Sequence, residues 1–182
     1  QSFVNQHEGH FGWRTYWSNG DVPLPAGRYN TSNLGSGTIE NWTGQTTTYA
    51  TANAGTQTYT GVTYVPDTVV IKMGINDLSE TGSVPSTTEG DLHQMVQQYQ
   101  AANANVRVYV ASVLPVSNSH AQAATLNPKV ATLNTLLAAN AAGWSTANSM
   151  VSYIDVRDGF DATKMTTDTV HLNYAGERIV AG

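Results

Sequence analysis

Two short polar clusters contain residue types that could act in catalysis. The first is GIND at residues 74–77, directly after the run TVVIKM. Gly74 allows a sharp turn, and the side-chain amide of Asn76 is a suitable donor to a developing oxyanion. The alternative is an ordinary turn in which asparagine and aspartate bond their own backbone. The spacing alone leaves both interpretations open.

The second cluster is DTVH at residues 168–171, which is followed by LNYAG. Asp168 lies three residues before His171, so its carboxylate can hold the imidazole in one tautomer. The other ring nitrogen is then free to act as a general base. The alternative is a loop histidine that makes one structural hydrogen bond, and the motif taken alone slightly favours this alternative.

A third cluster, HEGHFGW at residues 7–13, could supply metal ligands or a backbone donor. Its two histidines are three residues apart in a glycine-rich stretch, which differs from the HExxH pattern of zinc helices. No third ligand is evident, and this argues against a metal site. The backbone N–H of Gly12 is the better functional candidate.

The apolar pattern predicts the elements that would position these clusters. Strands are predicted at residues 68–73, 106–113 and 151–156. Helices are predicted at residues 88–101, from an Asn127 cap with Pro128 in the first turn, and from an Asn173 cap to the end of the chain. Strands that alternate with helices favour an α/β fold with a parallel sheet. In such folds the functional groups gather at the carboxyl ends of the strands.

Length and composition fit a single domain over residues 1–182, with a long Gly-, Thr- and Tyr-rich excursion at about residues 18–64. Charged residues make up 12% of the chain, below the ~25% typical of soluble domains. Neutral polar residues take their place. This mixture suits a secreted or cell-surface protein of bacterial type that acts on hydroxyl-rich material, although a polar surface without special meaning is the alternative.

Charge and hydropathy disfavour other classes of partner. The net charge is −5 and no basic run occurs, so nucleic acid is not expected to bind. The chain has no cysteine, which excludes disulfides and thiolate metal sites. No apolar run approaches the ~20 residues that span a bilayer, so no membrane span is expected.

Together the three clusters resemble the SGNH, or GDSL-type, ester hydrolases. GIND matches the family pattern GxND, and DTVH matches DxxH. HEGHFGW is similar to the HEGHSGW of acetylxylan-esterase-like members of carbohydrate esterase family three. The resemblance implies a three-layer α/β/α sandwich with a flavodoxin-like, five-stranded parallel sheet. It also implies hydrolysis of esters, often of acetyl groups on sugars, through an acyl-serine intermediate and without a metal or other cofactor.

The resemblance assigns a role to each matching residue. Asn76 and the backbone of Gly12 would donate to the oxyanion, His171 would be the general base, and Asp168 would orient His171. The substrate would be an acetylated polysaccharide or a small ester.

The serine-bearing block of the family, GDS, has no counterpart among these residues. Only eleven residues precede Gly12, none of them reads GDS, and no G-x-S-x-G elbow occurs elsewhere. The first strand and helix of the family fold are therefore expected to be absent, and the chain alone is expected to be inactive. Three explanations stay open. The preferred one is a fragment of an ordinary esterase; the others are a second polypeptide that supplies the block and a non-catalytic relative that binds glycans or assembles.

The strand order of flavodoxin-like sheets makes this absence specific. The apolar pair Phe3–Val4 would close the family's second strand, and residues 68–73 would form its third. The family's first strand lies between these two. A second polypeptide, a swapped strand or a further chain segment is therefore expected to fill that position.

Overall fold

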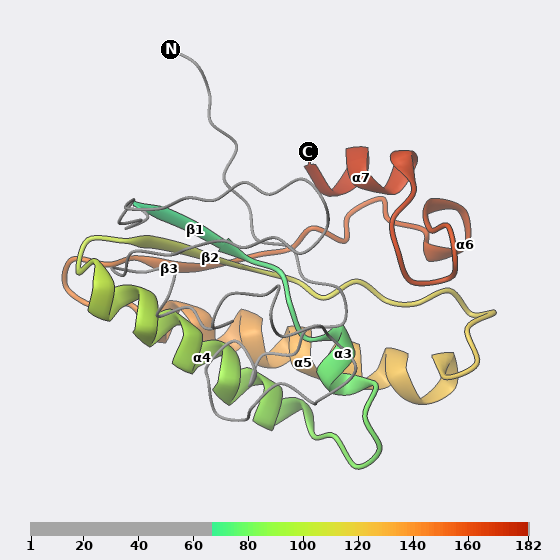
Figure 1. Ribbon diagram of the computed structural model, residues 1–182, viewed down its shortest axis with the longest axis horizontal. Coiled ribbons are helices and arrows are strands. Elements are labelled where there is room, and N and C mark those ends of the chain that lie inside the picture. Colours follow the sequence, from blue (N-terminus) through green and yellow to red (C-terminus); the bar gives the residue numbers. More distant parts are fainter. Residues whose placement is uncertain (1–66, 182) are drawn as a thin grey trace, which may run out of the picture.

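The computed structural model describes residues 67–181, which form an α/β fold around a parallel sheet (Figure 1). In chain order the elements are β1 (Thr68–Ile71), α3 (Ile75–Leu78), α4 (Pro85–Ala102), β2 (Arg107–Ala111), α5 (Ala123–Asn140), the 3-10 helix η2 (Ala141–Trp144), β3 (Val151–Ile154), α6 (Ala162–Met165) and α7 (Tyr174–Ala181). The three strands lie in the order β1-β2-β3, and both neighbouring pairs are parallel. The predicted fold class is confirmed.

The sheet is held in register by β-branched residues on its central strand. Val108 of β2 pairs with Val69 of β1 and with Val151 of β3. Both Val108 and Val151 are buried. Such residues favour strands because their stiff, branched side chains pack well on a pleated surface.

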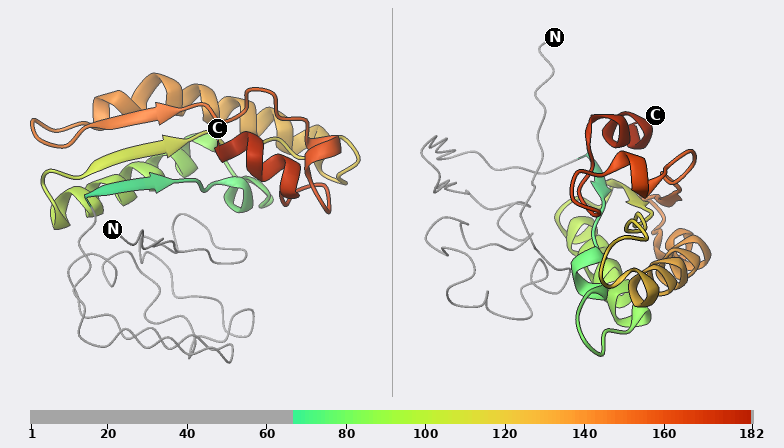
Figure 2. Two further views of the ribbon diagram at one scale, coloured as in Figure 1. Left: turned by 90° about the horizontal axis from the view of Figure 1, so that it is seen from above. Right: turned by 90° about the vertical axis from the view of Figure 1, so that its right-hand side faces the viewer.

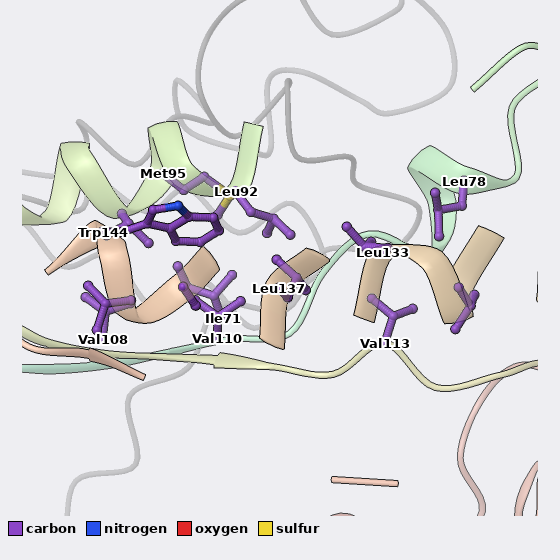
Figure 3. Packing of buried hydrophobic residues seen from close by; sticks show 14 of the residues in the cluster. Ile71, Leu78, Leu92, Met95, Val108, Val110, Val113, Leu133, Leu137 and Trp144 are labelled. Carbon is purple, nitrogen blue, oxygen red and sulfur yellow. The ribbon is translucent and has the colours of Figure 1, made fainter. Parts of the chain in front are cut away.

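Helices α4 and α5 cover one face of the sheet, and the hydrophobic core lies between them and the strands (Figure 1). Figure 3 shows Val108 and Val110 pointing from β2 toward the helices, and Leu92 and Met95 pointing from α4 toward the sheet. Each fully buried side chain of this kind contributes about 1.5–3 kcal/mol to folding. Helices α6 and α7 lie on the other side of the sheet, near its carboxyl edge.

Helix α4 contains the whole predicted helix at residues 88–101. Pro85 occupies its first turn, where a missing backbone N–H costs no hydrogen bond. Of the predicted apolar stripe, Leu92, Met95 and Val96 are buried, and Tyr99 packs against the core. The periodicity of the sequence therefore located both the helix and its inner face.

The predicted start of the next helix is wrong, whereas the predicted start of the last one is confirmed. Helix α5 begins at Ala123, so Asn127 and Pro128 lie inside it. The Asn127 side chain bonds the backbone of Val116 instead of an amide at the start of α5. In α7, Asn173 Oδ1 accepts from Gly176 N over 3.1 Å, which is the expected cap.

Some predictions fall outside the described residues. These concern the strand at Phe3–Val4, the cluster HEGHFGW with Gly12, the excursion at residues 18–64 and the absent first strand. Among the helices of residues 67–181, none combines the length and the apolarity needed to cross a membrane.

Candidate active site

The GIND and DTVH motifs both lie at the carboxyl edge of the sheet. Helix α3, which contains the end of GIND, directly follows β1, and the turn between α6 and α7 contains DTVH. Figures 1 and 2 show α3, α6 and α7 at the end of the sheet toward which the strands point. This is the edge at which parallel α/β folds place their functional groups.

Gly74 turns the chain from β1 into α3. Its φ of 124° is a conformation that residues with a Cβ rarely adopt. A Cβ at this position would also lie 3.1 Å from Leu133 Cδ2 and 3.2 Å from Val113 Cγ2. Leu78 N then donates to Gly74 O over 3.0 Å, which closes one helical turn. Asn76 is thereby fixed on a helical turn above the end of β1.

Lys129 of α5 holds the far end of α3. Its ammonium group donates to Ser83 Oγ over 2.8 Å and to Leu78 O over 3.4 Å. A cation is favourable at a helix C-terminus, where carbonyl groups point outward. Figure 3 shows Leu78 of α3 above Leu133 of α5. The position of GIND therefore depends on α5 as well as on β1.

Asp168 shapes the second motif and contacts its histidine directly. Asp168 Oδ1 accepts from the backbone N–H groups of Val170, over 3.2 Å, and His171, over 2.8 Å. Asp168 Oδ2 lies 2.6 Å from His171 Nδ1. The predicted hydrogen bond between the carboxylate and a ring nitrogen is present. When the proton of a neutral ring lies on Nδ1, Nε2 is the ring nitrogen whose lone pair can accept a proton.

The same contacts keep Asp168 ionised. The backbone N–H of His171, and next its side chain, lower the pKa of Asp168 to about 2. An ionised carboxylate accepts hydrogen bonds only, so the proton of a neutral imidazole lies on Nδ1. The side chains of His171 and Asp168 are 59% and 56% exposed, and solvent therefore screens their attraction. The pair fixes the orientation of the ring more than it stabilises the fold.

Backbone contacts hold the turn that contains DTVH. Thr167 N donates to His171 O over 2.8 Å, and Thr166 and Leu172 form an antiparallel bridge. Thr169 has a φ of 77°, in the left-handed region that β-branched residues rarely occupy. Its carbonyl accepts from Ser117 N over 2.9 Å.

The following LNYAG segment joins this turn to α7. Asn173 caps α7, and its Nδ2 also donates to Lys164 O over 2.8 Å. A Cβ on Gly176 would lie 2.3 Å from Met165 O, so only glycine fits without a shift of α6 or α7. The asparagine and the glycine of this segment therefore fix α7 against α6, directly beside His171.

A second carboxylate lies at the same edge, after β3. Asp155 accepts from Arg157 Nε over 2.7 Å and from Ser112 Oγ over 3.1 Å. The hydrogen bond from Arg157 is the main reason that the pKa of Asp155 falls to about 2. The carboxylate of Asp155 is therefore paired with Arg157. Within residues 67–181, no group of three or more His, Asp or Glu residues could hold a metal ion.

The structure places three of the four predicted site residues. Asp168 and His171 are hydrogen-bonded to each other, and Asn76 lies at the same edge of the sheet. Gly12 lies outside the described residues, so the expected convergence of Asn76, His171 and the backbone of Gly12 on one pocket stays a prediction. Ser117 and Lys129 could not be predicted from local sequence, because they contact the motifs from distant parts of the chain.

A parallel α/β sheet with an Asp–His pair at its carboxyl edge is compatible with an acylhydrolase. The chain belongs to the GDSL-like lipase/acylhydrolase family, whose sequence model matches residues 11–179. No curated protein matches the sequence significantly.

Two solved structures are similar to this chain along nearly all of its length. One is an acetyl esterase, solved as a serine-to-alanine mutant with an acetate ion, with 26% identity and a TM-score of 0.63 over 97% of this chain. The other is a carbohydrate esterase of family 3 from Talaromyces cellulolyticus, with 26% identity and a TM-score of 0.66 over 100% of this chain. The chain spans 66% of the first protein and 69% of the second.

Proposed function

We propose that the chain is the part of a serine ester hydrolase that holds the general base, and that the enzyme removes acetyl groups from carbohydrates. The observation that carries this proposal is the 2.6 Å contact between Asp168 Oδ2 and His171 Nδ1. Membership of an acylhydrolase family and similarity to an acetyl esterase and a carbohydrate esterase support it.

The proposed nucleophile is a serine outside these 182 residues, supplied by a further segment or a second polypeptide. Its hydroxyl oxygen attacks the ester carbonyl while His171 Nε2 accepts the hydroxyl proton. Asn76 and the backbone N–H of Gly12 stabilise the oxyanion. The bond to the leaving alcohol then breaks, and the imidazolium returns the proton to that alcohol.

Hydrolysis of the acyl-serine repeats these steps with water as the nucleophile and the serine oxygen as the leaving group. Water attacks the acyl carbon, and His171 accepts a proton from it. The serine oxygen leaves and receives that proton, and acetate is released. In both halves Asp168 keeps the ring oriented and stabilises the imidazolium.

An exposed aromatic residue that is close in sequence to the proposed base supports a sugar substrate. Tyr174 begins α7, three residues after His171, and is 75% exposed. The Arg178 guanidinium lies 6.0 Å from the centre of its ring. Aromatic faces of this kind stack on sugar rings. Replacing Tyr174 by alanine should lower the ratio of kcat/KM for acetylated xylan over kcat/KM for a small acetyl ester.

A serine-directed organophosphonate tests where the nucleophile lies. We expect the 182-residue chain alone to keep its intact mass and to release no acetate. The complete enzyme, meaning this chain together with the serine-bearing segment, should become labelled and release acetate from acetylated xylan. Stoichiometric labelling of a serine in the chain alone would place the nucleophile within it. Binding of xylan without release of acetate by the complete protein would instead favour a non-catalytic glycan-binding protein.

A further inference from the structure

One hydrogen bond joins the segment after β2 to the turn that contains the Asp–His pair. Ser117, which is buried, donates its backbone N–H to Thr169 O over 2.9 Å. Thr169 has a φ of 77°. A β-branched residue keeps this conformation only where its surroundings enforce it. The Ser117 N–H acts on Thr169 from outside the turn.

Asn127 fixes the backbone just before Ser117. Its Oδ1 accepts from Val116 N over 2.9 Å, and its Nδ2 donates to Val116 O over 3.0 Å. Two turns further along α5, Asn134 makes the same pair of bonds with Val113, each of 2.8 Å. The two asparagines therefore hold both ends of residues 113–116 against α5.

We propose that Asn127 is a positioning residue for the reaction. By fixing Val116, it places the Ser117 N–H where this group holds Thr169 in its left-handed conformation. The turn then keeps the imidazole of His171 in place. The inference rests on the proposed function, because that function makes His171 the general base.

Asn127 acts through the backbone and touches no reacting atom. A side chain that bonds both the N–H and the C=O of one residue fixes that residue in position and in rotation. The next N–H along the chain, that of Ser117, is then aimed by the same peptide plane. An asparagine that merely stabilised α5 would not determine the direction of this N–H.

The first test uses the 182-residue chain and needs no enzymatic activity. Asn127→Leu keeps the approximate size of the side chain and removes both bonds. Its matched control is Asn140→Leu, at the exposed end of the same helix, where the amide donates to Glu89 Oε1 over 2.7 Å. The two readouts are hydrogen exchange of the Ser117 amide and the NMR signal of the His171 Nδ1 proton.

We expect Asn127→Leu to speed exchange of the Ser117 amide by about tenfold or more relative to the control, because local opening becomes easier. The Nδ1 proton signal should shift or broaden in Asn127→Leu alone. A folded Asn127→Leu protein that matches the control in both readouts would overturn the inference. If Asn127→Leu does not fold, Asn127→Asp decides the question, since it keeps only the bond from Val116 N and should give an intermediate response. An Asn127→Asp protein that matches the parent chain would equally overturn it.

The second test uses the complete enzyme and a second substitution. Asn127→Leu should lower kcat for a small acetyl ester about tenfold and change KM little, because the base is displaced and the substrate contacts are not. Glycine adopts a φ of 77° without strain. In a Thr169→Gly background the same substitution should therefore lower kcat by about threefold or less. An equal loss in both backgrounds would contradict the proposed route. Absence of any esterase activity would refute the proposed function, whereas the exchange and NMR readouts would still decide the inference.

Discussion

Replacing Asn134 by leucine should destabilise the chain. The cause is the loss of two buried hydrogen bonds, because leucine keeps most of the packing volume. Asn134 is 2% exposed, and its amide makes two hydrogen bonds of 2.8 Å with the N–H and C=O of Val113. Leucine fills a similar volume but bonds neither group. The substitution therefore leaves a backbone donor and a backbone acceptor buried without their partner.

The size of the effect follows from these two groups. Each buried group that loses its hydrogen bond costs about 1–3 kcal/mol, so the two together cost about 2–6 kcal/mol. A domain of this size unfolds with a free energy of only about 5–15 kcal/mol. At about 3 °C per kcal/mol for a chain of this length, the melting temperature should fall by about 6–18 °C.

Thermal unfolding followed by circular dichroism measures this directly. The control is again Asn140→Leu, which loses one exposed hydrogen bond and should change stability by no more than about 0.5 kcal/mol. If Asn134→Leu melts within about 2 °C of this control, which is less than 1 kcal/mol, the two bonds to Val113 do not stabilise the fold as described.

Two further predictions concern the turn that contains the Asp–His pair. NMR titration of Asp168 should give a midpoint of about 2, and His171→Ala should raise the midpoint only part of the way to the ordinary 3.8, because the backbone N–H of residue 171 stays. The pKa of Asp168 is lower in the folded protein than in the unfolded one. Its stabilising effect is therefore complete above the ordinary pKa and is lost as the pH falls toward 2. A titration midpoint near 4 would contradict the contacts at this carboxylate. Gly176→Ala should destabilise the chain by about 1–3 kcal/mol in urea unfolding, because the new Cβ would meet Met165 O. Gly90→Ala in α4 is the control, since its Cβ has open space and should be neutral or stabilising; equal stability of the two variants would refute the close approach.

Local patterns in the sequence predicted most of the described fold. The apolar runs marked all three strands, and the stripe of Leu92, Met95 and Val96 marked α4 and its buried face. The strands are shorter than predicted, because Lys72 and Met73, for example, already lead into the turn at Gly74. The Gly74 turn itself was predictable, because few other residues adopt a φ of 124°.

The features that could not be predicted from the sequence depend on contacts between distant segments. The pair Asn127–Pro128 has the local pattern of a helix start, but α5 begins a turn earlier and uses Asn127 to bond Val116. The hydrogen bond from Ser117 to Thr169 joins two backbone groups, so the side-chain types in the sequence do not predict it. In the sequence, Lys129 has no feature that distinguishes it from other helical lysines. Its contact with α3 depends on the packing of α3 against α5.

Part of the candidate site could be predicted because its two motifs are local. The carboxylate and imidazole of DTVH are three residues apart, and one turn of chain brings Asp168 Oδ2 to His171 Nδ1. Asn76 follows the end of a strand, which placed it at the carboxyl edge. The separation of Asn76 from His171 depends instead on how α3 and α7 pack across the sheet, which no local pattern encodes.

The most direct test of the general-base assignment compares two alanine variants of the complete enzyme. The measurement is kcat/KM for a small acetyl ester in His171→Ala and in Asp168→Ala. His171→Ala should lose activity by about 10⁴-fold or more, and Asp168→Ala should lose at least about tenfold less, because the carboxylate orients the ring while the imidazole transfers the proton. Equal activity of His171→Ala and the parent enzyme would contradict the assignment of His171 as the base.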